Sequence, residues 1–367
     1  MSRSRGLVRR LAAGFAALGL GALLAVANVT GSAQAAVPDH WGFAYVNVPV
    51  GIPDPLHQAG SWPAAFKVKV TPGAPGQEFV RFPQIAAKAG VVHVTAVGDI
   101  PAWCQAQRWF PAGADEIAAV RCYRPGGAPL FVPFMVTFSQ SSTGSFPPGR
   151  AYGYVHFEPA QGIVTRFNSS GGVNTVTPGA VGSWVVSLPG LGSTGPSGNV
   201  QVTAVNPAQP AKCKLAAWAS LPGRQVLLVH CFDKLSTPLK TGWTLTYQRG
   251  RAITGTQPKL FAYTFDNTPL APGPYAPVPA AVNFNSLGGV NTVRTAGLGL
   301  RFVLFPRVGL APNTVLVTAF GPGPGFCNLL TLWFTSPAQV IVRDVACYTS
   351  LGARQNQASL ITYTSAH

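Results

Sequence analysis

Six cysteines are the residues whose spacing points most clearly to chemistry. They form three pairs whose members are 18, 18 and 20 positions apart: Cys104 and Cys122, Cys213 and Cys231, Cys327 and Cys347. In an exported chain this pattern predicts three local disulfide bonds, each closing a hairpin. Closing a loop of this size contributes roughly 3 kcal/mol in the loop-entropy model. The alternative is a thiolate metal site, but the chain has no CxxC motif and no recurring histidine partner, so no metal is expected.

Tryptophan follows the first cysteine of each pair at a nearly fixed distance. Trp109 and Trp218 lie five positions after it, and Trp333 lies six positions after it. In a regular strand, an offset of five turns the tryptophan to the face opposite the cysteine. An exposed indole ring can stack on the C–H face of a sugar, so these three residues are the candidate ligand-stacking residues. Core packing is the alternative role, and the shift at Trp333 weakens both interpretations.

Acid–base and nucleophilic groups show no recurring arrangement. The chain has no HExxH, HxH, phosphate-loop, dinucleotide or Gly-x-Ser-x-Gly motif. None of the 10 acidic residues recurs as an acid in all three copies of the internal repeat, which argues against a two-carboxylate hydrolase site. His93, His156 and His230 are expected in strands, half-buried or on the surface. No catalytic residue, cofactor or metal ligand is therefore predicted.

The internal repeat supplies the elements that position these residues. The sequence FNSSGGVNTV at 167–176 returns at 284–293 as FNSLGGVNTV, with nine of ten letters the same. VHVTAV at 92–97 returns as VQVTAV at 200–205 and as VLVTAF at 315–320. The cysteine pairs and their tryptophans keep the same order in each copy. The chain therefore contains three copies of one unit of about 110 residues.

We place the copies at 36–148 (repeat 1), 149–257 (repeat 2) and 258–367 (repeat 3). A unit of this size is a common domain size and is much longer than a solenoid unit, so we expect self-contained domains strung along the chain. Period-2 alternation of Val, Thr and aromatic residues between Pro and Gly turns predicts about seven strands per unit. In repeat 2 they are expected near Tyr152–Phe157, Val173–Thr177, Ser183–Leu188, Val200–Asn206, Cys213–Trp218, Gln225–Phe232 and Trp243–Gln248. The predicted fold class is all-β, with three tandem antiparallel β-sandwich domains.

The GGVN letters of the opening repeat motif are expected to be structural. Gly171 and Gly172 supply a turn that tolerates positive φ, and Asn174, like its counterpart Asn291, can hydrogen-bond the backbone of that turn. Repeat 1 has no Asn in the matching stretch, 60–66. One turn sequence can be exchanged for another, whereas a shared catalytic group usually cannot. A sugar-contacting loop is the alternative.

Residues 1–35 have the pattern of a signal peptide. A basic start precedes an apolar run from Leu11 to Val29, and an Ala-Gln-Ala sequence then supplies small residues for a signal peptidase. We expect cleavage after Ala35 or Ala36, by the Sec or the twin-arginine route. The alternative is a membrane anchor, but three glycines within the apolar run and the small residues that follow the run favour cleavage.

Removing this segment leaves a basic chain. Four Arg and no acids leave, so 26 Lys and Arg become 22 against 10 Asp and Glu, and the net charge falls from +16 to +12. Such a charge attracts polyanions such as teichoic acid, anionic lipid or nucleic acid. Alternatively, the positive charge serves only to keep a surface with few charged residues soluble. The basic residues are scattered, so no specific nucleic-acid motif is present. No later stretch is apolar enough to span a membrane.

Five features together resemble a known type of protein: an Ala-Tyr strand, a GGxNTV turn, a GxVxVTA strand, Cys-x4-Trp and Val-x-Cys-Phe-Asp. The combination resembles the tandem repeats of secreted proteins from high-GC Gram-positive bacteria. The resemblance covers nearly all of the chain after residue 35. It implies secretion, and it adds no catalytic residue, because no activity is assigned to that family.

Three functional interpretations follow from these observations. We expect a secreted, non-catalytic monomer, extracellular or associated with the cell wall, that binds cell-envelope or extracellular polysaccharide with avidity from its repeats. A structural or adhesive surface protein without a small ligand is the first alternative. A secreted hydrolase with an unrecognised site is the second. Solvent exposure of Trp109 and Trp218 would favour the binding protein.

Overall fold

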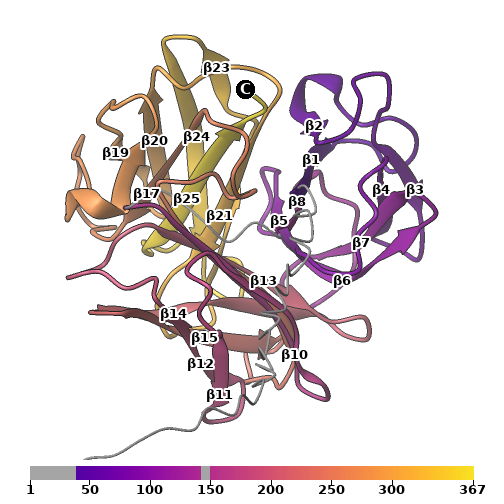
Figure 1. The fold of residues 1–367 in the computed structure, drawn as a ribbon, viewed down its shortest axis with the longest axis horizontal. Coiled ribbons are helices and arrows are strands. Elements are labelled where there is room, and N and C mark those ends of the chain that lie inside the picture. Colours follow the sequence, from indigo (N-terminus) through magenta and orange to yellow (C-terminus); the bar gives the residue numbers. More distant parts are fainter. Residues whose placement is uncertain (1–38, 142–148) are drawn as a thin grey trace, which may run out of the picture. The chain divides into compact units, whose positions relative to one another are not determined.

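The fold of the chain is all-β, as predicted. It was obtained as a computed structural model that describes residues 39–141 and 149–367, so the predicted signal peptide lies outside the described residues. The described residues form strands and two short 3-10 helices, with no α-helix among them (Figure 1). The strands of each repeat pair mainly antiparallel into two sheets, which makes each repeat a β-sandwich.

The strands follow one another in the same order in the three repeats. Repeat 1 contains β1 (His40–Val46), η1 (Pro55–His57), β2 (Gln58–Gly60), β3 (Lys69–Pro72), β4 (Gln77–Phe82), β5 (Val91–Ala96), β6 (Trp103–Ala112), β7 (Asp115–Tyr123) and β8 (Phe134–Gln140). Repeat 2 contains β9 (Ala151–Glu158), β10 (Gly162–Asn168), β11 (Thr175–Pro178), β12 (Ser183–Pro189), β13 (Asn199–Val205), β14 (Ala211–Leu221), β15 (Arg224–Asp233) and β16 (Gly242–Arg249). Repeat 3 contains β17 (Phe261–Asp266), η2 (Ala280–Val282), β18 (Asn283–Asn285), β19 (Thr292–Gly297), β20 (Leu300–Pro306), β21 (Asn313–Ala319), β22 (Phe326–Leu329), β23 (Phe334–Ser336), β24 (Gln339–Tyr348) and β25 (Ser359–Ser365).

Both sheets keep one strand order from repeat to repeat. The first sheet runs β2-β1-β8-β5, β10-β9-β16-β13 and β18-β17-β25-β21 in repeats 1, 2 and 3. The second runs β3-β4-β7-β6, β11-β12-β15-β14 and β19-β20-β24-β22, with β23 paired to β24. One parallel pair, Val205 with Ala106, joins β13 to β6, so the first sheet of repeat 2 and the second sheet of repeat 1 are continuous as one eight-stranded sheet. The seven strands expected in repeat 2 lacked β10. Most residues of this edge strand are only partly buried, so its sequence carries little of the apolar alternation that marks a strand.

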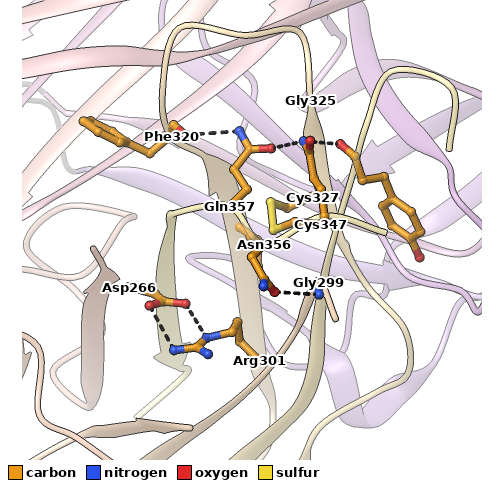
Figure 2. The surroundings of a disulfide bond; sticks show 12 residues. Asp266, Gly299, Arg301, Phe320, Gly325, Cys327, Cys347, Asn356 and Gln357 are labelled. Atoms are coloured by element: carbon orange, nitrogen blue, oxygen red, sulfur yellow. Dashed lines mark hydrogen bonds and ion pairs between the residues drawn. A yellow bond between two sulfur atoms is a disulfide. The ribbon is translucent and has the colours of Figure 1, made fainter. Parts of the chain in front are cut away.

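The three disulfides are formed as predicted. Each joins directly opposed residues of two neighbouring strands, with Cα atoms 4.0 to 4.1 Å apart: Cys104–Cys122, Cys213–Cys231 and Cys327–Cys347. Figure 2 shows the third bridge, with the Asn356 side chain accepting a hydrogen bond from the Gly299 amide nearby, at 2.9 Å. The same view contains a buried ion pair between Arg301 and Asp266, whose Nε–Oδ2 distance is 2.7 Å. This pair ties β20 to β17 and so links the two sheets of repeat 3.

The GGVN asparagines stabilise the backbone, as expected. Asn174 is fully buried, and its Nδ2 donates to the carbonyls of Tyr154 (3.1 Å) and Phe167 (2.8 Å). Its Oδ1 accepts from Asn168 Nδ2 at 2.7 Å. Asn291 makes the same set of bonds in repeat 3. The motif therefore fixes the start of the second sheet.

The VxVTA strands are buried on both faces, as are β17 and β25 of repeat 3. In β12 buried and partly exposed residues alternate, whereas every residue of β5, β13 and β21 is buried. The burial includes polar side chains: Gln201 and Thr203 are 2% and 4% exposed. One face of each strand packs in its own sandwich. The other face packs against the neighbouring repeats.

Threonine hydroxyls connect these three strands in a closed cycle. Each accepts a hydrogen bond from an amide of the equivalent strand in another repeat: Val94 N to Thr203 Oγ1 (3.2 Å), Val202 N to Thr318 Oγ1 (3.0 Å) and Val317 N to Thr95 Oγ1 (3.0 Å). Amide-to-carbonyl bonds at the strand ends form a second cycle: Asn206 to Ala106 (3.0 Å), Gly321 to Leu215 (2.9 Å) and Gly98 to Leu329 (2.8 Å). The described parts of repeats 1, 2 and 3 thus contact one another cyclically, each through the same positions.

The repeats consequently form one compact unit, and the expectation of self-contained domains strung along the chain does not hold. One hydrophobic cluster even contains Trp41 and Phe43 of repeat 1 together with Val303 and Phe305 of repeat 3. The physical reason lies in the VxVTA strand. The polar residues of this strand alternate in sequence as solvent-facing residues do. Their side chains instead form hydrogen bonds with other repeats, so the whole strand can be buried.

Candidate functional site

A β-bulge reverses the facing expected for Trp109 and Trp218. The register of β6 against β7 shifts by one residue before Trp109, which lies opposite Ala118, while the first cysteine lies opposite Cys122. Because Ala118 and Cys122 are four positions apart on β7, they share a face, and so do the tryptophan and its cysteine. The equivalent bulge in β14 has the same effect on Trp218. The predicted opposite facing is therefore wrong, since the extra residue turns both rings toward the core.

Trp218 and Trp333 are used in packing. Trp218 is half-buried, its Nε1 donates to Gln225 Oε1 at 2.8 Å, and its ring centroid lies 6.2 Å from that of Phe265 in repeat 3. Trp333 is 4% exposed, and its Nε1 donates to Asn313 Oδ1 at 2.6 Å. These contacts match the core-packing alternative. Trp109 is also partly buried against the core of repeat 1, but it lines a cavity, so the stacking role stays a prediction for this residue.

Trp109 lines a cavity of about 180 Å³ between β6 of repeat 1 and strands β9 and β10 of repeat 2. Its ring centroid lies 4.4 Å from that of His156, at an interplanar angle of 45°. His156 Nε2 lies 3.1 Å from Glu158 Oε1, so the carboxylate orients the imidazole. Lys88 and Arg108, both exposed, add two cations to the lining, and Gln107 and Thr165 add uncharged polar groups.

This lining suits recognition of a polar organic group. An aromatic ring with a few convergent polar groups is typical of a ligand site, but about 180 Å³ is less than the roughly 300 to 1,000 Å³ of most small-molecule pockets. The cavity therefore has room for part of a ligand, such as one sugar unit. Glu158 is the one carboxylate among the described lining residues, whereas glycoside hydrolysis commonly uses two.

The outer face of sheet β3-β4-β7-β6 carries basic and aromatic side chains in rows across the strands. One row contains Lys69, Arg81, Ile117 and Phe110, and the next contains Thr71, Phe79, Ala119 and Arg108. Residues between these positions, such as Val70 and Val80, are buried in the sandwich, so the rows point outward. We name this surface the basic face, and it consists of Lys69, Arg81, Arg108 and Arg121 with Phe79 and Phe110 between them.

Positive charge dominates the basic face. Its one carboxylate among the described residues is Asp115, whose Oδ2 lies 2.8 Å from Arg81 Nη1. The Arg108 guanidinium lies 5.3 Å from the centroid of Phe110, which holds the charge over an aromatic ring. Two acids of the same sheet, Glu78 and Glu116, point inward, and burial raises the pKa of each to about 7. They therefore carry only part of a negative charge near neutral pH.

A groove extends the basic face at the β3 edge. It has a volume of about 500 Å³ and is lined by Lys67, Lys69 and Arg81 together with Phe66, which is 42% exposed. On β6, the fourth of these strands, Arg108 and Phe110 also line the Trp109 cavity. The basic face therefore connects a charged groove to an aromatic cavity across four strands.

The equivalent surface of repeat 2 lacks this character. There the matching cross-strand row contains Thr177, Val185, Leu228 and Ala217, and Val185 is 37% exposed. The basic face is thus not reproduced in repeat 2; in repeat 3, one cation of the equivalent sheet, Arg294, lies 4.3 Å from the centroid of Phe302. The residues of the basic face come from four strands and form rows only after those strands pair, so their positions in the sequence do not reveal it.

Other chemistry is not indicated by the described residues. Within 39–141 and 149–367, no group of three or more His, Cys, Asp or Glu could hold a metal ion, and every cysteine is in a disulfide. In this same part of the chain, no helix has the length and apolar character needed to cross a membrane. Comparisons with protein-family models, curated proteins and solved structures found no match for this chain.

Proposed function

We propose that the protein is a secreted, non-catalytic protein that binds an anionic extracellular or cell-envelope polysaccharide through the basic face of repeat 1. The observation that carries the proposal is the basic face itself: two cross-strand rows with three cations and two phenylalanines, a fourth cation at Arg121, and a single carboxylate, which is paired with Arg81. Guanidinium and ammonium groups bind the carboxylates or phosphates of such polymers. A sheet face gives an extended chain a surface to lie along.

The Trp109 cavity provides the second element of this proposal. Arg108 and Phe110 belong both to the basic face and to the cavity lining, so a polymer lying on the face can place one sugar unit beside Trp109. Stacking on the indole ring supplies contact that does not depend on salt. Charge attraction along the basic face supplies the part of the binding that weakens as salt is added.

Secretion is supported by the cysteine chemistry. Three disulfides within an ordinary-sized chain fit an oxidising compartment such as the extracellular space. The signal-peptide pattern of residues 1–35 points the same way. A polysaccharide of the cell envelope or the surroundings is the polyanion that an exported protein meets.

The test compares two double variants that remove the same charge. Lys69→Gln with Arg108→Gln alters the basic face, and Arg224→Gln with Lys240→Gln removes two exposed cations of repeat 2. Each Lys or Arg near an anionic surface contributes about 1 kcal/mol, so two together give about a 30-fold loss of affinity. Binding of each variant to purified cell wall and to a defined anionic polysaccharide is measured at low salt.

The basic-face variant is expected to bind about 30-fold more weakly, while the repeat 2 variant stays close to the parent. An equal loss in both variants would mean that only net charge matters. Absence of binding by the folded parent protein at low salt would favour a structural or adhesive role.

A further inference from the structure

A second, smaller cavity lies where the three VxVTA strands meet. Its volume is about 50 Å³, and its walls come from β5, β13 and β21 and from the starts of β6, β14 and β22. All three repeats thus contribute the same two elements. A space of this size holds a small ion or a few water molecules and excludes a sugar ring.

The residue before the first cysteine of each repeat lines this cavity. It is Trp103 in repeat 1, Lys212 in repeat 2 and Phe326 in repeat 3. The two aromatic rings lie 5.4 Å apart, and Lys212 Nζ lies 4.8 Å from the Trp103 centroid and 5.5 Å from the Phe326 centroid. The framework therefore places a cation between two aromatic rings of other repeats.

Lys212 is buried without a hydrogen-bond partner for its ammonium group. The residue is 6% exposed, and Nζ has no acceptor among the described residues. Asp233 is the carboxylate that acts on Lys212 electrostatically, but its Oδ1 accepts the amides of Leu235 and Thr237. Three ammonium donors at Lys212 are therefore unused, which is costly for a buried charge.

Lys214 adds a second cation two positions further along β14. It is 3% exposed, and its Nζ donates to the Gly325 carbonyl at 3.2 Å, which leaves two donors. No Asp or Glu occurs among the described residues that line the cavity. Burial lowers the pKa of Lys212 to about 8, and burial together with the charge of Lys212 lowers that of Lys214 to about 7. Two like charges thus share a cavity whose lining carries no counter-charge, and Asp233, outside the lining, is the carboxylate that acts on Lys212.

We propose that this cavity binds a small monovalent inorganic anion, such as chloride, held by the ammonium groups of Lys212 and Lys214. The anion supplies the missing acceptor to Lys212, offsets the repulsion between the two lysines and fits the available volume. Because the walls come from all three repeats, bound anion stabilises their contact with one another. This site is separate from the basic face and does not depend on the proposed function.

The test measures halide dependence of stability and the position of bromide. The melting temperature of the full chain is recorded at constant ionic strength while sodium gluconate is replaced by sodium chloride or bromide. A rise in melting temperature that saturates with halide is expected, because a ligand of the folded state stabilises it. Lys212→Met should lose this rise, and the exposed-site control Lys240→Met should keep it.

Anomalous diffraction from bromide-soaked crystals locates the ion without any variant. A bromide peak in the cavity within about 3.5 Å of the Lys212 and Lys214 ammonium groups is expected. The proposal is overturned if the cavity shows no bromide, if bromide occupies only surface positions, or if Lys212→Met responds to halide as the parent protein does.

Discussion

Replacing Thr203 with valine removes one hydroxyl from the cycle that connects the repeats and leaves the side-chain shape almost unchanged. The Thr203 hydroxyl accepts a hydrogen bond from the Val94 amide at 3.2 Å, and it lies 3.2 Å from His93 Nδ1. His93 is 2% exposed, and its Nε2 lies 2.8 Å from the Thr246 hydroxyl. Burial lowers the pKa of His93 to about 3, so the ring is neutral and depends on these two hydroxyls.

The substitution leaves two buried polar groups without a partner, the Val94 amide and one ring nitrogen of His93. Each such group costs about 1–3 kcal/mol, so the variant is expected to lose about 2–6 kcal/mol of unfolding free energy. Thr177→Val, at an exposed position of β11, is the matched control and should change stability by no more than about 0.5 kcal/mol.

Urea titrations followed by tryptophan fluorescence give both free energies by linear extrapolation. A loss for Thr203→Val no larger than that of the control would refute the reasoning, since it would mean that the bonds between repeats are not made in solution.

The remaining predictions concern three other features of the chain. The pKa of Lys214 is lowered to about 7 in the folded protein, while the unfolded chain keeps this proton to about pH 10. The folded protein should therefore gain stability from pH 7 to pH 9. Lys214→Met should lose part of that gain, as measured by urea titrations at each pH. Asp266→Asn leaves the Arg301 guanidinium, whose side chain is 2% exposed, without its counter-charge, so a loss of about 3–5 kcal/mol is expected; a loss under about 1 kcal/mol would contradict a buried ion pair. Replacing Cys213 and Cys231 together with alanine should cost roughly 3 kcal/mol, measured against the oxidised parent; equal stability would show that the bridge adds nothing to the folded state.

Features that depend on neighbouring residues could be predicted from the sequence. The two cysteines of a pair lie close in sequence, on one hairpin in repeats 1 and 2 and on β22 and β24 in repeat 3, so their spacing alone indicates the bridge. Asn174 and Asn291 recur with the same flanking letters, and their role in fixing a turn follows from local hydrogen bonding. Strands with one buried face, such as β12, show the alternation that marks them.

Features that depend on distant pairing could not be predicted. Thr203 and His93 bond partners more than a hundred positions away, and alternation cannot distinguish water from the backbone of another repeat. Trp109 was assigned to the wrong face because a bulge adds one residue to β6. Lys69 and Arg108 belong to one surface only because four strands pair in a particular register.

The most direct measurement of the basic face as the polysaccharide-binding surface is protection of individual lysines from acetylation. The protein is acetylated at low salt with and without an anionic polysaccharide, and the modification of each lysine is quantified by mass spectrometry. All four lysines compared are exposed: Lys67 and Lys69 beside the basic face, and Lys240 and Lys259 elsewhere. We predict that the polysaccharide slows acetylation of Lys67 and Lys69 several-fold and leaves Lys240 and Lys259 unchanged. Protection of Lys240 or Lys259 with Lys69 unchanged, or equal protection at all four, would contradict a binding surface on repeat 1.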